Sequence, residues 1–525
     1  MAEWLNMKQL QDQNWGYFSW GIIGGKWIHV TPLRYATDGR NWRVVNGALT
    51  CRDWFYAISE DPEWLWPKKI RGITSNGGIY VVCDQKFYEV DVSTWAFTER
   101  SSVGNRFAND VDVNMINFWK NIICLSWDDY PWVYNTSSNA WAQLTSSNIE
   151  SWANPHIWAK FLYGTYVAGT GTKNNVLYIS RWVTTTHPEY AYDWVNSAEK
   201  LELQSPIEWI VASKERLYIF TEETIEILTA QSLLSTWWAT STYTIPIGWE
   251  NRIASHRSVV VADNIIFFLT KDNQIKTISY VPGITENDIW TITNRQGLNI
   301  EKILSTLDAD QSWSFGYFHK WKSLVKFNVK EWGETMNTLW LVYDLTNDNF
   351  YVDDNKYFSC VAKYNGKYYA WSDATPFVYI DEIWGDDDGW PIVWYRNGAY
   401  RAPWLGGSRT EYREAMFMGQ IGADTDVNFD ILIDDVIKWN GTISWSAISS
   451  SALGSEPIAY TAIWWEYEAN SLLKFEKSYW PWDLRARGNM IQVNLDWSGM
   501  ALEFAISWLA IWYLPLWDTD KWNKL

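Results

Sequence analysis

The sequence predicts an all-β protein, in which a β-propeller is followed by a C-terminal β-sandwich. Strand pairs with short polar turns recur from about residue 70 to residue 384, and helical patterns are scarce throughout. After about residue 401 the strands alternate apolar and polar residues, as half-exposed antiparallel sheets do. A length of 525 residues allows two to four domains of about 150 residues each, or one large β-architecture with an appendage.

The recurring strand pair has the form of the inner hairpin of a propeller blade. Each repeat has an approach strand, a turn with Gly or Asn, an aromatic-aliphatic strand, a polar turn and an outer strand. The intervals between equivalent positions are irregular, but they average near the length of a blade, about 40 to 50 residues. The sequence therefore predicts six to eight blades, and the count of repeats gives seven. The positions taken as equivalent are Tyr80, Ile123, Tyr178, Tyr218, Phe267, Leu341 and Tyr368.

Alternating strands at 427–435 and 489–496 predict the C-terminal sandwich. A Ser/Ala-rich stretch at 444–457 reads as a loop, and residues 397–407 read as the linker before the sandwich. The predicted organisation is an N-terminal arm with the first strands at 1–50, the propeller at 51–400 and the sandwich at 401–525.

The charge balance limits the classes of partner. With 43 Lys and Arg against 61 Asp and Glu the net charge is −18, which disfavours a protein that reads DNA sequence, because phosphate binding depends on cationic side chains. No membrane-spanning run and no secretory signal are visible, so we expect no membrane span and synthesis in the cytoplasm. The four cysteines lie far apart and are expected to be free thiols: Cys51, Cys83, Cys124 and Cys360.

No motif predicts a catalytic, cofactor-binding or metal site. The five histidines stand far apart, and no phosphate-binding or nucleophile motif is present. The strongest candidate for a small-ligand site is the acidic stretch 381–389, where Asp386, Asp387 and Asp388 could hold a hard cation such as Ca²⁺. Its spacing fits no EF-hand, so a solvated acidic loop is the interpretation that we favour.

Tryptophan is unusually frequent, with 42 residues against only 30 glycines. One hairpin turns on Asn365-Gly366, whereas the hairpin at 117–122 places Trp119 where a glycine would stand. Tight turns often need a positive φ, which glycine adopts freely and tryptophan does not. Similar turn-like settings surround Trp15, Trp249, Trp321 and Trp497. Our hypothesis is that many tryptophans are glycine in the natural protein, because its gene comes from a lineage that reads UGA as glycine; the alternative is a set of exposed indoles that stack on sugars or partners.

Three segments resemble a virion protein family, the tail nozzle or packaged-DNA stabilisation proteins of short-tailed bacteriophages and related propeller-bearing tail adaptors. They are residues 213–228 (SKERLYIFTEETIEIL), residues 253–269 (IASHRSVVVADNIIFFL) and the closing stretch from 488–493 (GNMIQV) to 504–513 (FAISWLAIWY). The resemblance is a pattern of strand pairs over roughly residues 20–515. Reading Trp209, Trp249, Trp508 and Trp512 as glycine improves the match.

The resemblance implies a structural role without catalysis. Copies, six by family resemblance, would form a ring below the portal and adaptor, contact other tail proteins, and act as a conduit that retains packaged double-stranded DNA and opens for ejection. The expected location is the virion tail after synthesis in the host cytoplasm. A wall of acidic charge would let DNA slide through without binding it.

Two other functions fit the sequence. The runner-up is a carbohydrate-binding or glycoside-cleaving propeller, supported by the aromatic content of 18%. A third is a propeller scaffold for protein partners.

Overall fold

A computed structural model gives the fold. It describes residues 8–10, 36–45, 48–51, 54–57, 70–144, 157–161, 166–180, 199–213, 216–229, 245–249, 252–279, 289–293, 300–372, 378–383, 392–398, 410–421, 426–444, 473–479, 486–488, 491–499 and 504–515, apart from 95, 103, 105, 127, 128, 172, 173 and 355. The prediction of an all-β protein is confirmed, because helix in these residues is limited to single turns such as α2 (Glu301–Leu304), η5 (His256–Ser258) and η6 (Lys320–Lys322).

Seven four-stranded antiparallel sheets form a β-propeller, and six of them consist of consecutive strands. Blades 1 to 3 are β6 (Ile70–Ser75), β7 (Ile79–Cys83), β8 (Lys86–Val90) and β9 (Phe97–Glu99); β10 (Asn114–Phe118), β11 (Asn121–Leu125), β12 (Trp132–Asn135) and β13 (Ala140–Gln143); and β14 (Ile157–Phe161), β15 (Tyr166–Thr170), β16 (Val176–Ile179) and β17 (Glu199–Glu202). Blades 4 to 6 are β18 (Ile207–Ser213), β19 (Arg216–Thr221), β20 (Thr224–Thr229) and β21 (Ile245–Trp249); β22 (Val259–Ala262), β23 (Ile265–Leu269), β24 (Ile275–Ser279) and β25 (Ile289–Thr291); and β26 (Phe315–His319), β27 (Leu324–Val329), β28 (Leu339–Asp344) and β29 (Asn349–Asp353).

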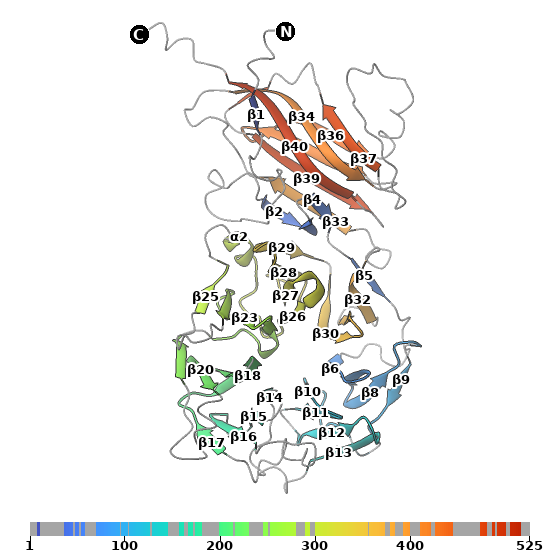
Figure 1. Ribbon diagram of the computed structural model, residues 1–525, viewed down its shortest axis with the longest axis vertical. Helices are drawn as coiled ribbons and strands as arrows, with labels where there is room; N and C mark the ends of the chain where they lie inside the picture. Colours follow the sequence, from blue (N-terminus) through green and yellow to red (C-terminus); the bar gives the residue numbers. More distant parts are fainter. Residues whose placement is uncertain are drawn as a thin grey trace.

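The seventh blade closes the ring with a strand from the other end of the chain. It contains β30 (Phe358–Tyr364), β31 (Lys367–Ser372) and β32 (Val378–Ile383), and its outer strand is β5 (Trp54–Ala57), which pairs antiparallel with β32. The innermost strands β30 and β6 are also in contact, so blade 7 meets blade 1 (Figure 1).

The count of seven blades is therefore confirmed, although two of the positions taken as equivalent are wrong. Five of them lie on the second strand of a blade, but Tyr178 lies on the third strand, β16, and Leu341 lies on the third strand, β28. This misalignment explains the irregular intervals, because second and third strands carry the same aromatic-aliphatic pattern.

Two further sheets form the second domain. One contains β1 (Lys8–Leu10), β3 (Trp42–Val45), β4 (Ala48–Cys51), β34 (Thr410–Ile421), β37 (Leu473–Tyr479), β38 (Ala486–Gly488) and β40 (Phe504–Pro515). The other contains β2 (Ala36–Arg40), β33 (Ile392–Gly398), β35 (Asp426–Ile433), β36 (Val436–Ser444) and β39 (Ile491–Gly499).

The second domain draws on both ends of the chain. Strands β1 to β4 come from the segment expected to be an N-terminal arm, and β33 begins before the boundary expected at residue 400. The alternation on β35 and β39 matches their burial, because Val427, Phe429, Ile431, Val493 and Leu495 are buried. Of the loop and linker expected at 444–457 and 397–407, residues 445–457 and 399–407 lie outside the described residues.

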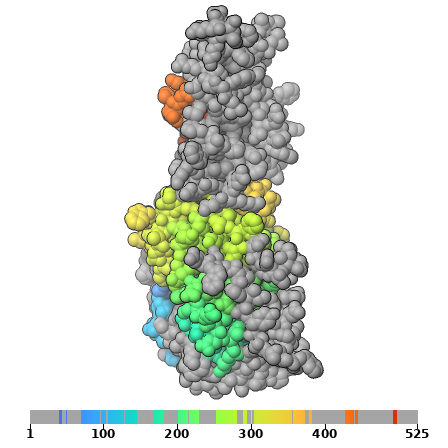
Figure 2. All heavy atoms as spheres, turned by 90° about the vertical axis from the view of Figure 1, so that its left-hand side faces the viewer, coloured from blue at the N-terminus to red at the C-terminus, as the bar shows by residue number. Residues whose placement is uncertain are grey.

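Figure 1 shows the blades arranged around a centre, with the second domain beyond the outer edge of blade 6, next to β29. In Figure 2 the outer edge of blades 4 and 5 faces the viewer, below that domain. The second domain is therefore attached to the outer edge of the propeller. Strands β27, β28 and β29 are buried along their whole length, as expected for strands covered on both faces.

Candidate functional site

The most elaborate polar arrangement among the described residues is the junction between the two domains, where the turn from β2 to β3 docks on the end of β29. The Asn41 backbone N–H donates to the Val352 carbonyl oxygen at 2.8 Å, and the Asp354 N–H donates to Asn41 Oδ1 at 3.0 Å. Asn41 Nδ2 donates in return to the Asp354 carboxylate. Asn41 has a φ of 61°, a left-handed conformation that asparagine tolerates better than most residues.

A buried ion pair lies behind this turn. Arg43 donates from both terminal nitrogens to the Asp353 carboxylate, at 2.7 and 2.5 Å, and the two side chains are 6% and 0% exposed. The Arg43 guanidinium also lies 5.1 Å from the centre of the Tyr351 ring. Closer to solvent, Arg40 pairs with Glu331 at 2.9 Å. A bidentate arginine–carboxylate pair fixes orientation as well as distance, so β3 cannot rotate on β29 without breaking it.

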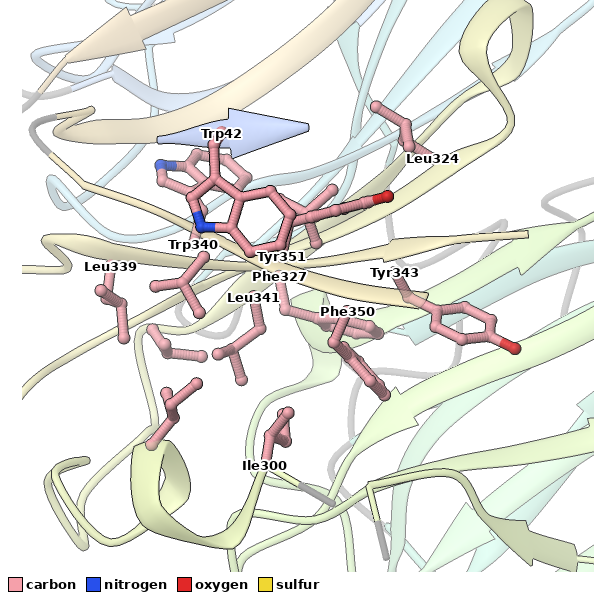
Figure 3. Packing of buried hydrophobic residues seen from close by; sticks show 14 of the residues in the cluster. Trp42, Ile300, Leu324, Phe327, Leu339, Trp340, Leu341, Tyr343, Phe350 and Tyr351 are labelled. Atoms are coloured by element: carbon pink, nitrogen blue, oxygen red, sulfur yellow. The ribbon is translucent and has the colours of Figure 1, made fainter. Parts of the chain in front are cut away.

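Apolar packing makes the junction continuous with both cores. Trp42 is buried and meets Tyr351 edge to face, with ring centroids 5.3 Å apart, beside Trp340 (Figure 3). One apolar cluster extends from the blade 6 residues Phe327 and Phe350 through Trp42 to residues of β35 and β39. Domains joined by a small polar contact usually move relative to each other, whereas a buried apolar junction holds them at one angle. The junction therefore couples the two domains rigidly.

A second buried cluster joins blades 6 and 7. Asp381, in β32, accepts hydrogen bonds from Lys326 Nζ and Lys356 Nζ, each at 2.8 Å, and from the Tyr317 hydroxyl. The three charged side chains are each 1% exposed. Asp381 is the first residue of the acidic stretch considered for a cation, and its carboxylate is engaged by two ammonium groups in this seam between blades.

The remainder of that acidic stretch, including Asp386, Asp387 and Asp388, lies outside the described residues. Within the described ranges, no group of three or more His, Cys, Asp or Glu side chains is placed to hold a metal ion. No helix in the same ranges is long and apolar enough to cross a bilayer. Cys83, Cys124 and Cys360 are buried free thiols, as predicted, and burial raises the pKa of the Cys124 thiol well above its usual range.

The tryptophans expected in turns divide into different cases. The expectation is wrong for Trp249 and Trp497, which pair within strands β21 and β39, and Trp15 lies outside the described residues.

Trp119 is the first residue of the two-residue turn between β10 and β11, has a φ of 51°, and is 46% exposed. Among the tryptophans that the structure describes, it alone has a positive φ. Trp321 is 77% exposed, but the left-handed position of its turn is Ser323. By register Trp119 corresponds to Asn365 of the blade 7 turn and not to Gly366, so its positive φ favours glycine or asparagine at position 119. The turn at Trp321 places no tryptophan at a positive φ.

Other tryptophans are integral to the core. Trp340 is buried and donates from Nε1 to the Lys356 carbonyl oxygen at 2.9 Å, and the indole of Trp132 donates to Asp129 at 3.1 Å. A buried indole whose N–H donates a hydrogen bond is typical of a position where tryptophan is the natural residue.

Sequence reasoning did not identify the junction. Arg43 and Asp353 are separated by 310 residues, and neither stands in a recognisable motif. The one local signal is Asn41, because asparagine is a common residue at a left-handed turn position.

Comparisons with known proteins identify no family for this chain. No protein-family model matches the chain, and no curated protein matches its sequence. Among solved structures, the crystal structure of BamB from Moraxella catarrhalis is similar at a TM-score of 0.37 and 9% identity, covering 66% of this chain and 96% of that one. This likeness is too weak to support an argument about either fold or function, and the propeller assignment rests on the strand pairing described above.

Proposed function

We propose that the chain is a structural subunit of a bacteriophage virion, of the tail-nozzle type, which assembles into a ring-shaped conduit for double-stranded DNA. The ring would retain the packaged genome, open for ejection, and contact the portal or adaptor and other tail proteins. The family resemblance of residues 213–228, 253–269 and 488–513 is the source of this proposal.

The observation that carries the proposal is the rigid junction. A wall of a conduit under internal pressure needs subunits that do not flex between their domains, and Arg43–Asp353 together with the packing of Trp42 supplies such a junction.

Exposed indoles are the observation that favours a carbohydrate-binding protein. In blade 6, Trp313 and Trp332 are 55% and 77% exposed, and Trp321 is 77% exposed. The antiparallel register of β26 and β27 places Trp313 and Trp332 at one end of that blade and Trp321 at the other. The three exposed rings of blade 6 therefore do not share one platform, although Trp321 lies at the same end of the propeller as the exposed Trp119 of blade 2.

The test is the assembly state of the purified full-length chain, measured at micromolar concentration by size-exclusion chromatography with light scattering, with negative-stain electron microscopy to show the shape of the particles. We expect closed rings of identical subunits and no hydrolysis of glycans. A particle that remains a monomer at micromolar concentration, or specific binding on a glycan array, would overturn the proposal in favour of a scaffold or a sugar-binding propeller.

A further inference from the structure

The first turns of four consecutive blades form a connected rim around the propeller centre. They join the first and second strands of blade 6 (residues 319–323), blade 7 (363–367), blade 1 (75–78) and blade 2 (118–121). The first strands of neighbouring blades in this arc contact one another. We call these four turns the inner rim.

Side-chain hydrogen bonds link each turn of the inner rim to the next. From blade 6 to blade 7, the Lys320 N–H donates to the Tyr368 hydroxyl at 2.7 Å. From blade 7 to blade 1, Ser75 Oγ donates to the Lys363 carbonyl oxygen at 2.6 Å, and the Tyr364 hydroxyl donates to the Gly77 carbonyl oxygen at 3.2 Å.

Blade 1 is linked to blade 2 in the same way. Asn76 Nδ2 donates to the Trp119 carbonyl oxygen at 2.9 Å, and Asn117 Nδ2 donates to the Ser75 carbonyl oxygen at 2.7 Å. The four turns are therefore held in fixed positions relative to one another. Any charged residues in these turns are thus brought close together before a ligand binds.

That charge is positive. Lys120, Lys320, Lys363 and Lys367 are exposed, and none of these four ammonium groups has a carboxylate partner among the described residues. Lys322 is half-buried in the same rim. The four turns contain no Asp or Glu, so the inner rim is a lysine strip on a protein whose net charge is −18.

The strip has clear limits. The acid Glu89 lies near the blade 1 turn, 3.6 Å from the position of a Cβ at Gly78, and it pairs with Arg100 at 2.6 Å. Blade 5 carries the exposed Asp263 in the equivalent turn, and acids return in the turns farther from the centre, at Asp91 and Asp348. In blade 7 the acidic stretch 381–389 begins at Asp381, which pairs with Tyr368 next to Lys367.

We propose that the inner rim binds the phosphate backbone of double-stranded DNA without reading its sequence. Lysine is depleted at the cores of protein–protein interfaces, whereas flexible ammonium groups suit a row of phosphates. The choice of DNA as the polyanion rests on the proposed function. At 0.1 M salt the Debye length is about 10 Å, so the strip acts locally while the more distant acids are screened.

The test is fluorescence anisotropy with a labelled, mixed-sequence 30-base-pair duplex between 50 and 300 mM NaCl. With four to five phosphate contacts, the plot of log affinity against log salt should have a slope of about −4. The double variant Lys120→Gln/Lys367→Gln should reduce that slope by about 2 and weaken binding on the order of 50-fold at 0.1 M salt.

The control is Lys271→Gln/Lys438→Gln, which removes two exposed lysines outside the inner rim, one of them, Lys271, paired with Glu208 at 3.4 Å, and should leave binding unchanged. Absence of duplex binding at 50 mM salt, an equal loss in the control, or preference for polyglutamate over the duplex would overturn the inference. Electron microscopy of the same samples separates the two proposals. Rings that do not bind the duplex refute the inner rim alone, whereas rim-dependent binding by a monomer refutes the proposed function alone.

Discussion

The turn at Trp119 allows a sharp test of backbone strain. Its hairpin closes with Phe118 opposite Asn121, and Trp119 holds a φ of 51° between them. The equivalent turn of blade 7 uses Asn365 and Gly366, with φ values of 47° and 82°. Tryptophan therefore occupies a backbone conformation that a residue without a Cβ adopts at no steric cost.

Comparing glycine with alanine isolates this strain, because Trp119→Gly and Trp119→Ala both remove the indole and its contact with Phe118, whose ring centroid lies 4.9 Å away. A Cβ in the left-handed region costs roughly 1–2 kcal/mol. Glycine loses about 0.5–1 kcal/mol relative to alanine through its greater freedom in the unfolded chain. Glycine should therefore be more stable than alanine at position 119 by about 0.5–1 kcal/mol.

Hydrogen exchange of the amides in residues 114–125, followed by mass spectrometry, measures the local opening of this hairpin. The glycine variant should exchange about two- to fivefold more slowly than the alanine variant. Trp290, exposed within strand β25, is the matched control, and there alanine should protect its strand better than glycine. If alanine protects both sites better, the turn imposes no glycine requirement and the strain argument is refuted.

Three further predictions concern buried and partly buried charge. Arg43→Ala should lower the free energy of unfolding of the junction by about 3–5 kcal/mol in urea titrations, because it leaves a buried carboxylate unpaired. The control Arg252→Ala, at an exposed pair, should lower it by under about 1 kcal/mol. Equal effects of the two substitutions would contradict the rigid junction. Asp381→Asn should open the seam between blades 6 and 7 to limited proteolysis, since two buried ammonium groups would lose their counterion, and an unchanged digest would argue against this. Burial, and then the charge of Asp496, raises the pKa of the Asp430 carboxyl, so its ionised form destabilises the folded state above that pKa and the penalty disappears as pH falls through it. Asp430→Asn should therefore raise the melting temperature at pH 7. On acidification, the melting temperature of this variant should rise less than that of the unsubstituted chain.

Most of the architecture was predictable because local sequence patterns indicate the strands and turns that build it. Runs such as β23 and β31, bounded by polar turns, identify blade strands without knowledge of their partners. The alternation along β35 similarly identifies a sheet with one buried face. Assignment of a strand to its place within a blade failed at Tyr178 and Leu341, because burial on both faces gives second and third strands the same composition.

Long-range pairings left no local pattern to read. The closure of blade 7 pairs Tyr56 with Ile380, and nothing in the sequence of an apolar outer strand indicates which strand it pairs with. The Arg43–Asp353 pair and the lysines of the inner rim are likewise brought together only by the circular order of the blades. Single lysines such as Lys120 and Lys367 are unremarkable in a linear sequence, and the strip emerges only when their turns become neighbours on one rim.

The most direct test of the central claim is peptide mass spectrometry on purified phage particles from the source sample. The tryptic peptide from Phe107 to Lys120 is diagnostic, because it also reports the residue at position 119. A virion subunit predicts that this peptide is present in the particles at a level comparable with other tail components, with glycine at position 119 if UGA is read as glycine. Its recovery from infected cells and absence from the particles would contradict the assignment to the virion tail.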